Sequence, residues 1–381
     1  MKKLFWKFAM AAFLVPAIAL TSCNDDDENL PTFEGSELSG EIAEPVSLDA
    51  SVAYTLTAPL FIKEGGELTI PAGTTIKAGK GFDKYILVLQ GGKINVNGTA
   101  ANPVTITSGA TDPAAEDWGG LIINGRAPLA GGGTATTEIN ADYPYGGSIA
   151  NDNSGSITYL ILAYTGARNS ADVEHNGFTL NGVGSGTKIE NVFIPFGADD
   201  GIEFFGGSVN VKNLLVVNSD DDMFDMTYGW SGTLENCYGV WKQGFVSTES
   251  DPSGVEADGN FDGNFSEHTG QSDFTIRNMT IENNGVEMNN VLKIRRGAKA
   301  TIENALVKGN GTVKTSGAIV DMTDSKGNGN TASAISITNA LTSLPAATAT
   351  KFGGDSYPYV TVGGNNTGCA TNIFSWTGYS F

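Results

Sequence analysis

The sequence predicts an all-β protein that folds as a single-stranded parallel β-helix. Three observations support this prediction. Glycine is frequent, at 50 of 381 residues, short runs rich in Val, Ile, Thr and Phe replace long helical patterns, and one motif recurs about every 22 residues. In such a stack, each coil of about three short strands climbs one inter-strand spacing, about 4.8 Å.

The first 22 residues have the features of a secretory signal peptide. Three lysines precede an apolar stretch, and small residues lie just before Cys23. The ending LTSC at residues 20–23 resembles the lipobox of bacterial lipoproteins, in which the cysteine becomes the lipidated first residue. An ordinary signal peptide followed by an unrelated cysteine is the alternative. We expect acyl chains on Cys23 to anchor the protein in the outer-membrane lipid, because no later segment holds 18 consecutive apolar residues.

Residues 23–40 are predicted to be an acidic tether. The run NDDDENLP follows directly after the signal peptide and Cys23, and it resembles the surface-export signal of Bacteroidetes lipoproteins. The same residues would serve equally well as a solvated spacer. We expect an outer-membrane lipoprotein exposed at the cell surface, with the periplasmic face as the alternative. The β-helix domain is placed at residues 41–381.

The repeating motif consists of an apolar residue, a polar residue, an asparagine and a short β run. Residues 67–79, 91–109, 117–129 and 154–167 have a similar texture and are interpreted as earlier coils. The spacings between the asparagines are 22, 23, 42 and 26 residues, and we interpret the 42 as two coils, one of them distorted by the loop 247–272. We expect the asparagines to stack at one corner as a ladder of side-chain amides. They are Asn191, Asn213, Asn236, Asn278 and Asn304.

Two pairs of aspartates lie one coil apart. Asp199 and Asp200 precede the run GIEF, and Asp221 and Asp222 precede MF 22 residues later. Stacked carboxylates about 5 Å apart repel each other, so they need water, a cation or a raised pKa. The net charge of −20 makes binding to nucleic acid unfavourable and suits calcium. The sequence therefore predicts either hydrated turn corners or a calcium clamp between coils.

The same aspartates also allow catalytic interpretations. The stretch GADDGIEF is locally similar to β-helix polysaccharide hydrolases, whose paired carboxylates act as general acid and base. Those hydrolases carry a histidine in a Gly-His-Gly setting, whereas this chain has only His175 and His268, in other settings. A lyase would need calcium and a base, for which Lys293, Arg295 and Arg296 are the candidates.

A second candidate calcium site lies in the run EADGNFDGNFSEH at residues 256–268. Asp258, Asn260 and Asp262, followed by a glycine, match positions 1, 3, 5 and 6 of an EF-hand loop. Position 12 is Thr269 in place of the usual glutamate, and no helical pattern flanks the loop. We expect a partial calcium loop, and a metal-free turn is the alternative.

Aromatic residues near the expected coil ends are candidates for stacking on sugar rings. The alternative is that they fill the interior of the stack. Trp376 is expected to cover the terminal coil, and the two cysteines after Cys23, at positions 237 and 369, are expected to be buried thiols. The ligand-binding candidates are Tyr143, Tyr145, Tyr228 and Trp230.

Several long stretches resemble one protein family. They include LFIKEGGELTIPAGTTIKAG, DWGGLIINGRAPL, NGFTLNGVGSGTKIENVFI, DDGIEFFGGSVNVKNLLVVNSDDDMFD and IRRGAKATIENALV. These resemble a family of Bacteroidetes outer-membrane lipoproteins, and the resemblance implies a right-handed parallel β-helix of the pectin-lyase-like type, with no established activity. We therefore expect a non-enzymatic binding or adhesion module for glycan, such as polysaccharide, or another surface partner. A polysaccharide hydrolase or lyase on the same scaffold is the alternative.

Overall fold

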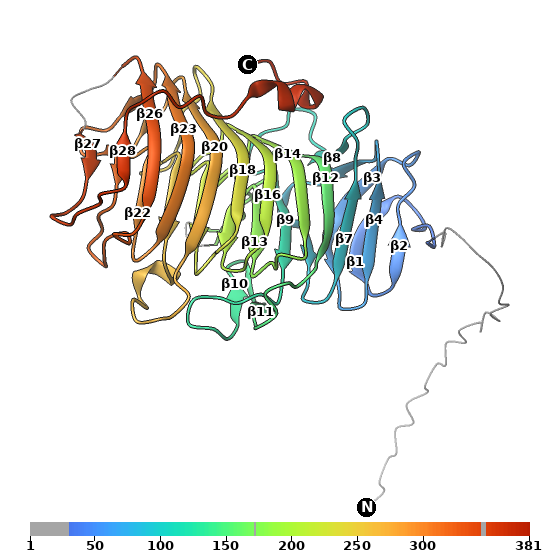
Figure 1. Cartoon of the computed structure of the whole chain (residues 1–381). Coiled ribbons are helices and arrows are strands. Elements are labelled where there is room, and N and C mark those ends of the chain that lie inside the picture. The colour runs from blue at the N-terminus through green and yellow to red at the C-terminus, as the bar shows by residue number, and fades with distance from the viewer. Residues whose placement is uncertain (1–29, 171–172, 344–347) are drawn as a thin grey trace, which may run out of the picture. The chain divides into compact units, whose positions relative to one another are not determined.

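The computed structural model describes residues 30–170, 173–343 and 348–381, of which those from Pro31 onward form one compact unit. The predicted signal peptide, Cys23 and residues 24–29 of the acidic run lie outside the described residues. Parallel strands stacked side by side dominate this unit (Figure 1). The described part contains two short 3₁₀ helices, η1 (Phe261–Gly263) and η2 (Thr371–Thr377). The predicted all-β parallel β-helix is confirmed.

Each central coil contributes three strand segments, which stack into three faces. Face 1 consists of short strands that pair in parallel with one another: β13 (Phe178–Asn181), β15 (Glu203–Phe205), β17 (Phe224–Thr227), β19 (Val255–Asp258), β22 (Leu292–Arg295), β25 (Ala318–Asp321) and β27 (Thr348–Lys351). Faces 2 and 3 are the first and second halves of longer strands: β14 (Lys188–Pro195), β16 (Asn210–Val217), β18 (Thr233–Trp241), β20 (Asp273–Asn283), β23 (Lys299–Gly309) and β26 (Ala334–Leu341), followed by β28 (Val360–Val362).

The opening coils continue the same stack toward the N-terminus. Their strands are β1 (Glu37–Ile42), β2 (Pro45–Ser47), β3 (Tyr54–Ile62), β4 (Glu67–Pro71), β5 (Thr75–Ala78), β6 (Gly81–Val88), β7 (Lys93–Asn97), β8 (Val104–Ser108), β9 (Trp118–Asn124) and β12 (Gly155–Leu162). Strand β1 begins inside the predicted tether, because Leu38 is buried in the core and pairs with β3. The β-helix therefore starts earlier than residue 41.

The expected asparagine ladder forms the corner between faces 2 and 3. Each side-chain Nδ2 donates to the Oδ1 of the asparagine one coil before it, at 2.9 Å in all four steps. All five asparagines have φ between 54° and 59°, the left-handed region that asparagine tolerates better than most residues. The asparagine therefore turns each long strand from face 2 into face 3.

The interpretation of the 42-residue spacing as two coils is wrong. Asn278 donates directly to Asn236, and β18 pairs with β20, so the 42 residues form a single coil. Two insertions, residues 242–254 before β19 and residues 259–272 after it, lengthen this coil. They extend outward from two corners and add no strand to the stack. The number of residues between two asparagines therefore does not distinguish two coils from one coil with insertions.

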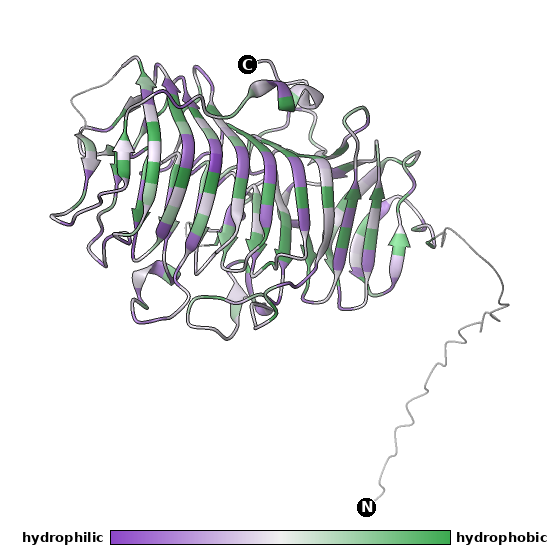
Figure 2. Ribbon diagram, viewed as in Figure 1, coloured by the Kyte–Doolittle hydropathy of each residue, from purple (hydrophilic) through white to green (hydrophobic). Residues whose placement is uncertain are grey.

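Apolar and polar residues alternate along many of the strands (Figure 2), and apolar side chains that point inward are buried in one core cluster. In face 3 the alternation ends: every residue of β16 after Asn213 is buried, because both sides of the sheet are covered. The outer side carries an apolar cluster around Leu215 and Tyr238, and Phe374 of η2 packs against it. This apolar outer cluster is the reason that the final residues return across face 3.

The expectation that Trp376 covers the terminal coil is wrong. After β28 the chain turns back, and Asn304 Oδ1 accepts the N–H of Thr367 at 2.8 Å. Trp376 then reaches Tyr159 of β12, with an edge-to-face ring contact at 5.3 Å. The C-terminal segment, residues 365–381, thus lies along the side of the stack between β23 and β12.

Candidate functional site

The predicted aspartate pairs lie at the corner between faces 3 and 1, on adjacent coils. Asp200 Oδ1 accepts the backbone N–H of Asp222 at 3.0 Å, and Asp222 Oδ1 accepts that of Ser253 at 2.6 Å. One coil earlier, Asn176 Oδ1 accepts the N–H of Asp200 at 3.4 Å. A side-chain oxygen of each coil therefore binds the backbone of the next, which forms a second ladder.

The structure brings five aspartates of this corner together. Carboxylate oxygens of Asp199, Asp200 and Asp221 lie within 4.8 Å of one another, as do those of Asp200, Asp222 and Asp225. The Oδ1 atoms of Asp221 and Asp225 are buried without a hydrogen-bond partner in the described part of the chain. Buried carboxylate oxygens without a partner are costly in a folded protein, and a bound cation would satisfy them. We call these five residues the aspartate cluster.

Asp225 joins the cluster although the motif analysis did not select it as a ligand. It follows the buried Phe224 at the start of β17, so strand alternation turns its side chain outward. It lies in register with Glu203 on β15 and Glu256 on β19. The period-2 pattern of a strand after the Asp-Asp pair is the signal that identifies it.

Outward-facing residues of face 1 change from apolar to acidic along the stack. Phe61, Leu87 and Ile122 precede Thr179 in register, and three acids follow it before Lys293. Burial raises the pKa of Asp200, Asp222 and Asp225 well above the usual value, and neighbouring carboxylates raise it further. The pKa of Asp221 rises to about 8 for the same reasons. The cluster therefore favours a proton or a cation over free carboxylates.

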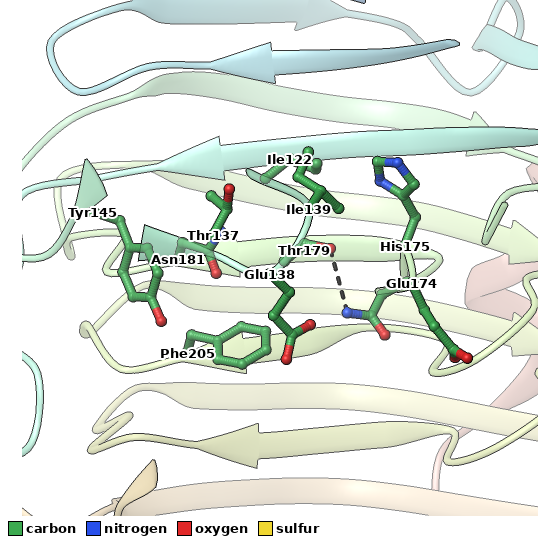
Figure 3. Close-up of a pocket in the computed structure, with 11 residues that line it drawn as sticks. Ile122, Thr137, Glu138, Ile139, Tyr145, Glu174, His175, Thr179, Asn181 and Phe205 are labelled. Carbon is green, nitrogen blue, oxygen red and sulfur yellow. Dashed lines mark hydrogen bonds between the residues drawn. The ribbon is translucent and has the colours of Figure 1, made fainter. Parts of the chain in front are cut away.

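A hairpin of β10 (Ala135–Thr137) and β11 (Asn140–Tyr145) folds over face 1 beside the cluster. In Figure 3 the carboxylate of Glu138, from this hairpin, lies between Phe205 and Glu174, and all three line one small pocket together with His175. The pocket between them has a volume of about 10 Å³, roughly the room for one water molecule. His175 Nε2 lies 3.0 Å from Phe82 O, and burial lowers the histidine pKa to about 4. The pocket is too small for a sugar ring, and its histidine is neutral.

The candidate bases of face 1 are held in ion pairs. Lys293 Nζ lies 3.1 Å from Asp321 Oδ2 and donates to Thr323 O at 2.6 Å. Arg295 pairs with Glu256 and Asp258, and these carboxylates raise its pKa although burial opposes them. Arg295 therefore stays charged and does not accept a proton at neutral pH.

The expected EF-hand-like loop is not formed. Asp258 is bound by Arg295 at 2.8 Å and by Arg296 at 2.5 Å, so its oxygens face guanidinium groups. The Asn260 amide spans the loop, donating to Gln271 Oε1 at 2.8 Å and accepting from the backbone of residue 265. Asp262 is exposed to solvent. The three predicted ligands therefore do not converge on one point.

The prediction that Trp230 stacks on a sugar is wrong, and so is that for Tyr145. Trp230 is 0% exposed, and its ring stacks between Phe204 and Phe274 in the core. Tyr145 is 2% exposed, because the hairpin packs it against face 1.

The other two predicted ligand-binding aromatic residues are partly exposed to solvent. Tyr143 is half-buried against Phe61, with ring centroids 5.2 Å apart. Tyr228 is half-buried against Phe261 at 5.3 Å. Cys237 and Cys369 are buried free thiols, as expected.

Comparison with known proteins supports the fold. Residues 40–379 match the sequence profile of a family described as the pectate-lyase-like β-helix domain. No curated protein and no solved structure matches the chain. Among the described residues, no helix is long and apolar enough to cross a membrane. The match confirms the predicted right-handed β-helix of the pectin-lyase-like type.

Proposed function

Since this chain belongs to the family of pectate-lyase-like β-helix domains, we propose that it is a lipid-anchored, surface-displayed module that binds glycan or another surface partner without cleaving it. The burial and pairing of the candidate catalytic groups is the observation that carries this proposal. Asp200 and Asp222 are 6% and 3% exposed, and Lys293 and Arg295 are held by carboxylates. A glycan-cleaving site needs an acid and a base that reach the substrate.

Calcium is the cation proposed for the aspartate cluster. It takes six to eight oxygen ligands in flexible geometry, and carboxylates are its usual ligands in proteins. The two groups of three carboxylates share Asp200. Their oxygens come from two successive coils, so a bound calcium ion would hold those coils together. In this proposal calcium supports the fold and takes no part in a reaction.

The proposed lipid anchor at Cys23 can be tested by determining which cell fraction contains the protein. The Cys23→Ser variant is expected to leave the membrane fraction and become soluble, because the acyl chains are the proposed attachment of this Bacteroidetes-type lipoprotein. Fractionation of cells, followed by detection of the protein, makes the measurement. The control replaces Ser22 with alanine, which keeps the cysteine. A Cys23→Ser protein that stays in the membrane after a salt wash contradicts the anchor.

A polysaccharide lyase is the second candidate, and it is supported by acids and a cationic side chain that lie in register on face 1. Asp225, Glu256 and Lys293 lie in register on three successive strands, which brings the aspartate cluster and a cationic side chain to the same side. The pairing of Lys293 with Asp321 is the argument against it.

Incubation with acidic polysaccharides separates the two candidate functions. We expect the wild-type protein with calcium to release neither new reducing ends nor unsaturated uronates, because its acids are buried and its bases are paired. Absorbance of unsaturated products and a reducing-sugar assay make the measurement. Release of either product by the wild type, together with its loss in Asp200→Asn, would show that the protein is an enzyme.

A further inference from the structure

A groove of about 650 Å³ lies at the corner between faces 1 and 2. Its volume falls within the range of small-molecule sites, about 300–1,000 Å³. The aspartate cluster precedes the strands of face 1, whereas this groove follows them, so the two sites lie at opposite corners. The residues that line the groove come from the segment 125–154, from the insertion 259–272 and from the coil corners between them. They include Pro128, Leu129, Ser208, Ser231, His268 and Asp273.

One wall of the groove is a segment that runs along the stack, residues 125–131. It bonds to the corners of successive coils, through Gly125 N to Asn181 O at 2.7 Å and Ala127 N to Gly182 O at 2.8 Å. Further along, Ala130 N donates to Tyr228 O at 2.9 Å and Gly131 N donates to Thr269 O at 2.8 Å. This wall is fixed by backbone bonds, so a ligand that docks against it does not have to order it first.

Glycine at the corner lets this wall approach closely. Gly207 has a φ of 79°, and its N–H donates to Pro128 O at 2.9 Å. At Gly229, one coil further along and with a φ of 91°, a Cβ would lie 2.6 Å from Ala130 N of the wall, so a larger residue does not fit without movement. The groove floor is therefore main chain and small side chains, which leaves backbone groups and hydroxyls near the ligand space.

The groove offers hydroxyl and ring contacts without a free charge. The Ser208 hydroxyl donates to Ala150 O at 2.7 Å and that of Ser231 donates to Gly207 O at 3.2 Å, so both keep lone pairs that accept hydrogen bonds. His268 is 30% exposed and stacks on Phe265 with ring centroids 4.7 Å apart. Asp273 is paired with Lys299 at 3.0 Å.

We propose that this groove binds a neutral oligosaccharide chain. The inference rests on the proposed function and names its site and its class of ligand. Sugar hydroxyls donate to the serine hydroxyls and to main-chain carbonyls, and the exposed part of the His268 side chain borders the same space. A uronate chain finds no lysine or arginine among the described residues that line the groove, and Lys299 beside it is held by Asp273.

The test is an array of neutral oligosaccharides, with oligogalacturonate as the anionic comparison. Ser231→Trp fills the groove from an exposed position, and we expect it to weaken binding of neutral chains by at least about tenfold, or about 1.4 kcal/mol. His268→Ala is expected to weaken it as well. The matched control is Ser51→Trp, at an exposed turn serine between β2 and β3 that does not line the groove, and it is expected to keep wild-type affinity. Equal melting temperatures show that all variants fold.

The outcomes separate this inference from the proposed function. If the wild type binds neutral glycan and Ser231→Trp binds it equally well, the groove is not the site, although the binding function stands. Binding of the anionic chain alone, or of none of the oligosaccharides, overturns the neutral-glycan inference. Cleavage of any of the chains contradicts the proposed function itself.

Discussion

Replacing Trp230 with alanine lowers the free energy of unfolding by about 3–5 kcal/mol, as expected for a large aromatic residue removed from a core. The ring stacks on Phe204 at 4.2 Å and on Phe274 at 5.6 Å, so it links three coils. Its Nε1 donates to Val209 O at 3.1 Å, and the substitution leaves that buried carbonyl without this donor. Chemical denaturation, followed by intrinsic fluorescence or circular dichroism, measures the loss.

The control for this substitution is Tyr359→Ala. Tyr359 is 66% exposed on the last coil, so its loss is expected to change stability by less than about 0.5 kcal/mol. A Trp230→Ala protein that unfolds like the wild type, yet loses affinity for a sugar, would return Trp230 to the ligand-binding surface.

In chelator, the melting temperature is expected to fall as the pH rises from about 5 to about 8. Burial first, and then neighbouring acids, raise the pKa of Glu138 to about 7. Burial also raises that of Glu256 to about 7, against the opposing effect of Arg295. In the unfolded chain both groups titrate near their ordinary value of 4.5. Between these values the folded state holds more protons, so stability declines as the pH rises, by up to about 1.4 kcal/mol per pH unit for each group.

Calcium is expected to oppose this decline, because its charge replaces that of the protons. A site filled to 100 times its dissociation constant adds about 2.7 kcal/mol of stability. For a unit of about 350 residues this corresponds to about 4 °C in melting temperature. Magnesium is expected to add less, since it prefers strict octahedral geometry and keeps its waters.

Two double variants locate the calcium effect. Asp200→Asn with Asp222→Asn removes charge from the aspartate cluster and is expected to abolish the calcium increment. Asp258→Asn with Asp262→Asn is the control: it weakens the arginine pairs and lowers the starting melting temperature, but it keeps the increment. Wild-type protein that melts identically in calcium and in chelator at pH 8 has no stabilising metal, and the aspartates are then protonated or hydrated corners.

Periodic features of the fold were predictable from the sequence, because position in a repeat fixes position in space. Asn191 and Asn213 repeat at 22 residues and stack, and the same offset brings Asp200 beside Asp222. The coil with the 42-residue spacing escaped this reasoning, since its two insertions extend outward from corners. The length of an insertion does not indicate whether it contains a further coil of the stack.

Orientation at the corners was the other feature that residue order did not reveal. Tyr228 has a φ of 56°, which interrupts the alternation of side chains, so counting from β17 does not decide whether Trp230 faces solvent or core. The partners of Asp258 were also hidden, because Arg295 lies 37 residues further along the chain and reaches it from the next coil. Contacts between coils at non-repeating positions need the three-dimensional structure.

The returning C-terminal segment sets a limit on how this protein can change during evolution. Thr367 of this segment bonds to Asn304, and Trp376 packs against Tyr159. The length of the segment between these contacts therefore fits one particular number of coils between β12 and β23. Duplicating one repeat, the ordinary way in which solenoids grow, would lengthen the distance between these contacts by about 4.8 Å. Trp376 would then miss Tyr159, and apolar residues of the added coil would face water. New length is therefore tolerated at the corners, where residues 125–154 and 259–272 already extend and where the proposed ligand groove lies.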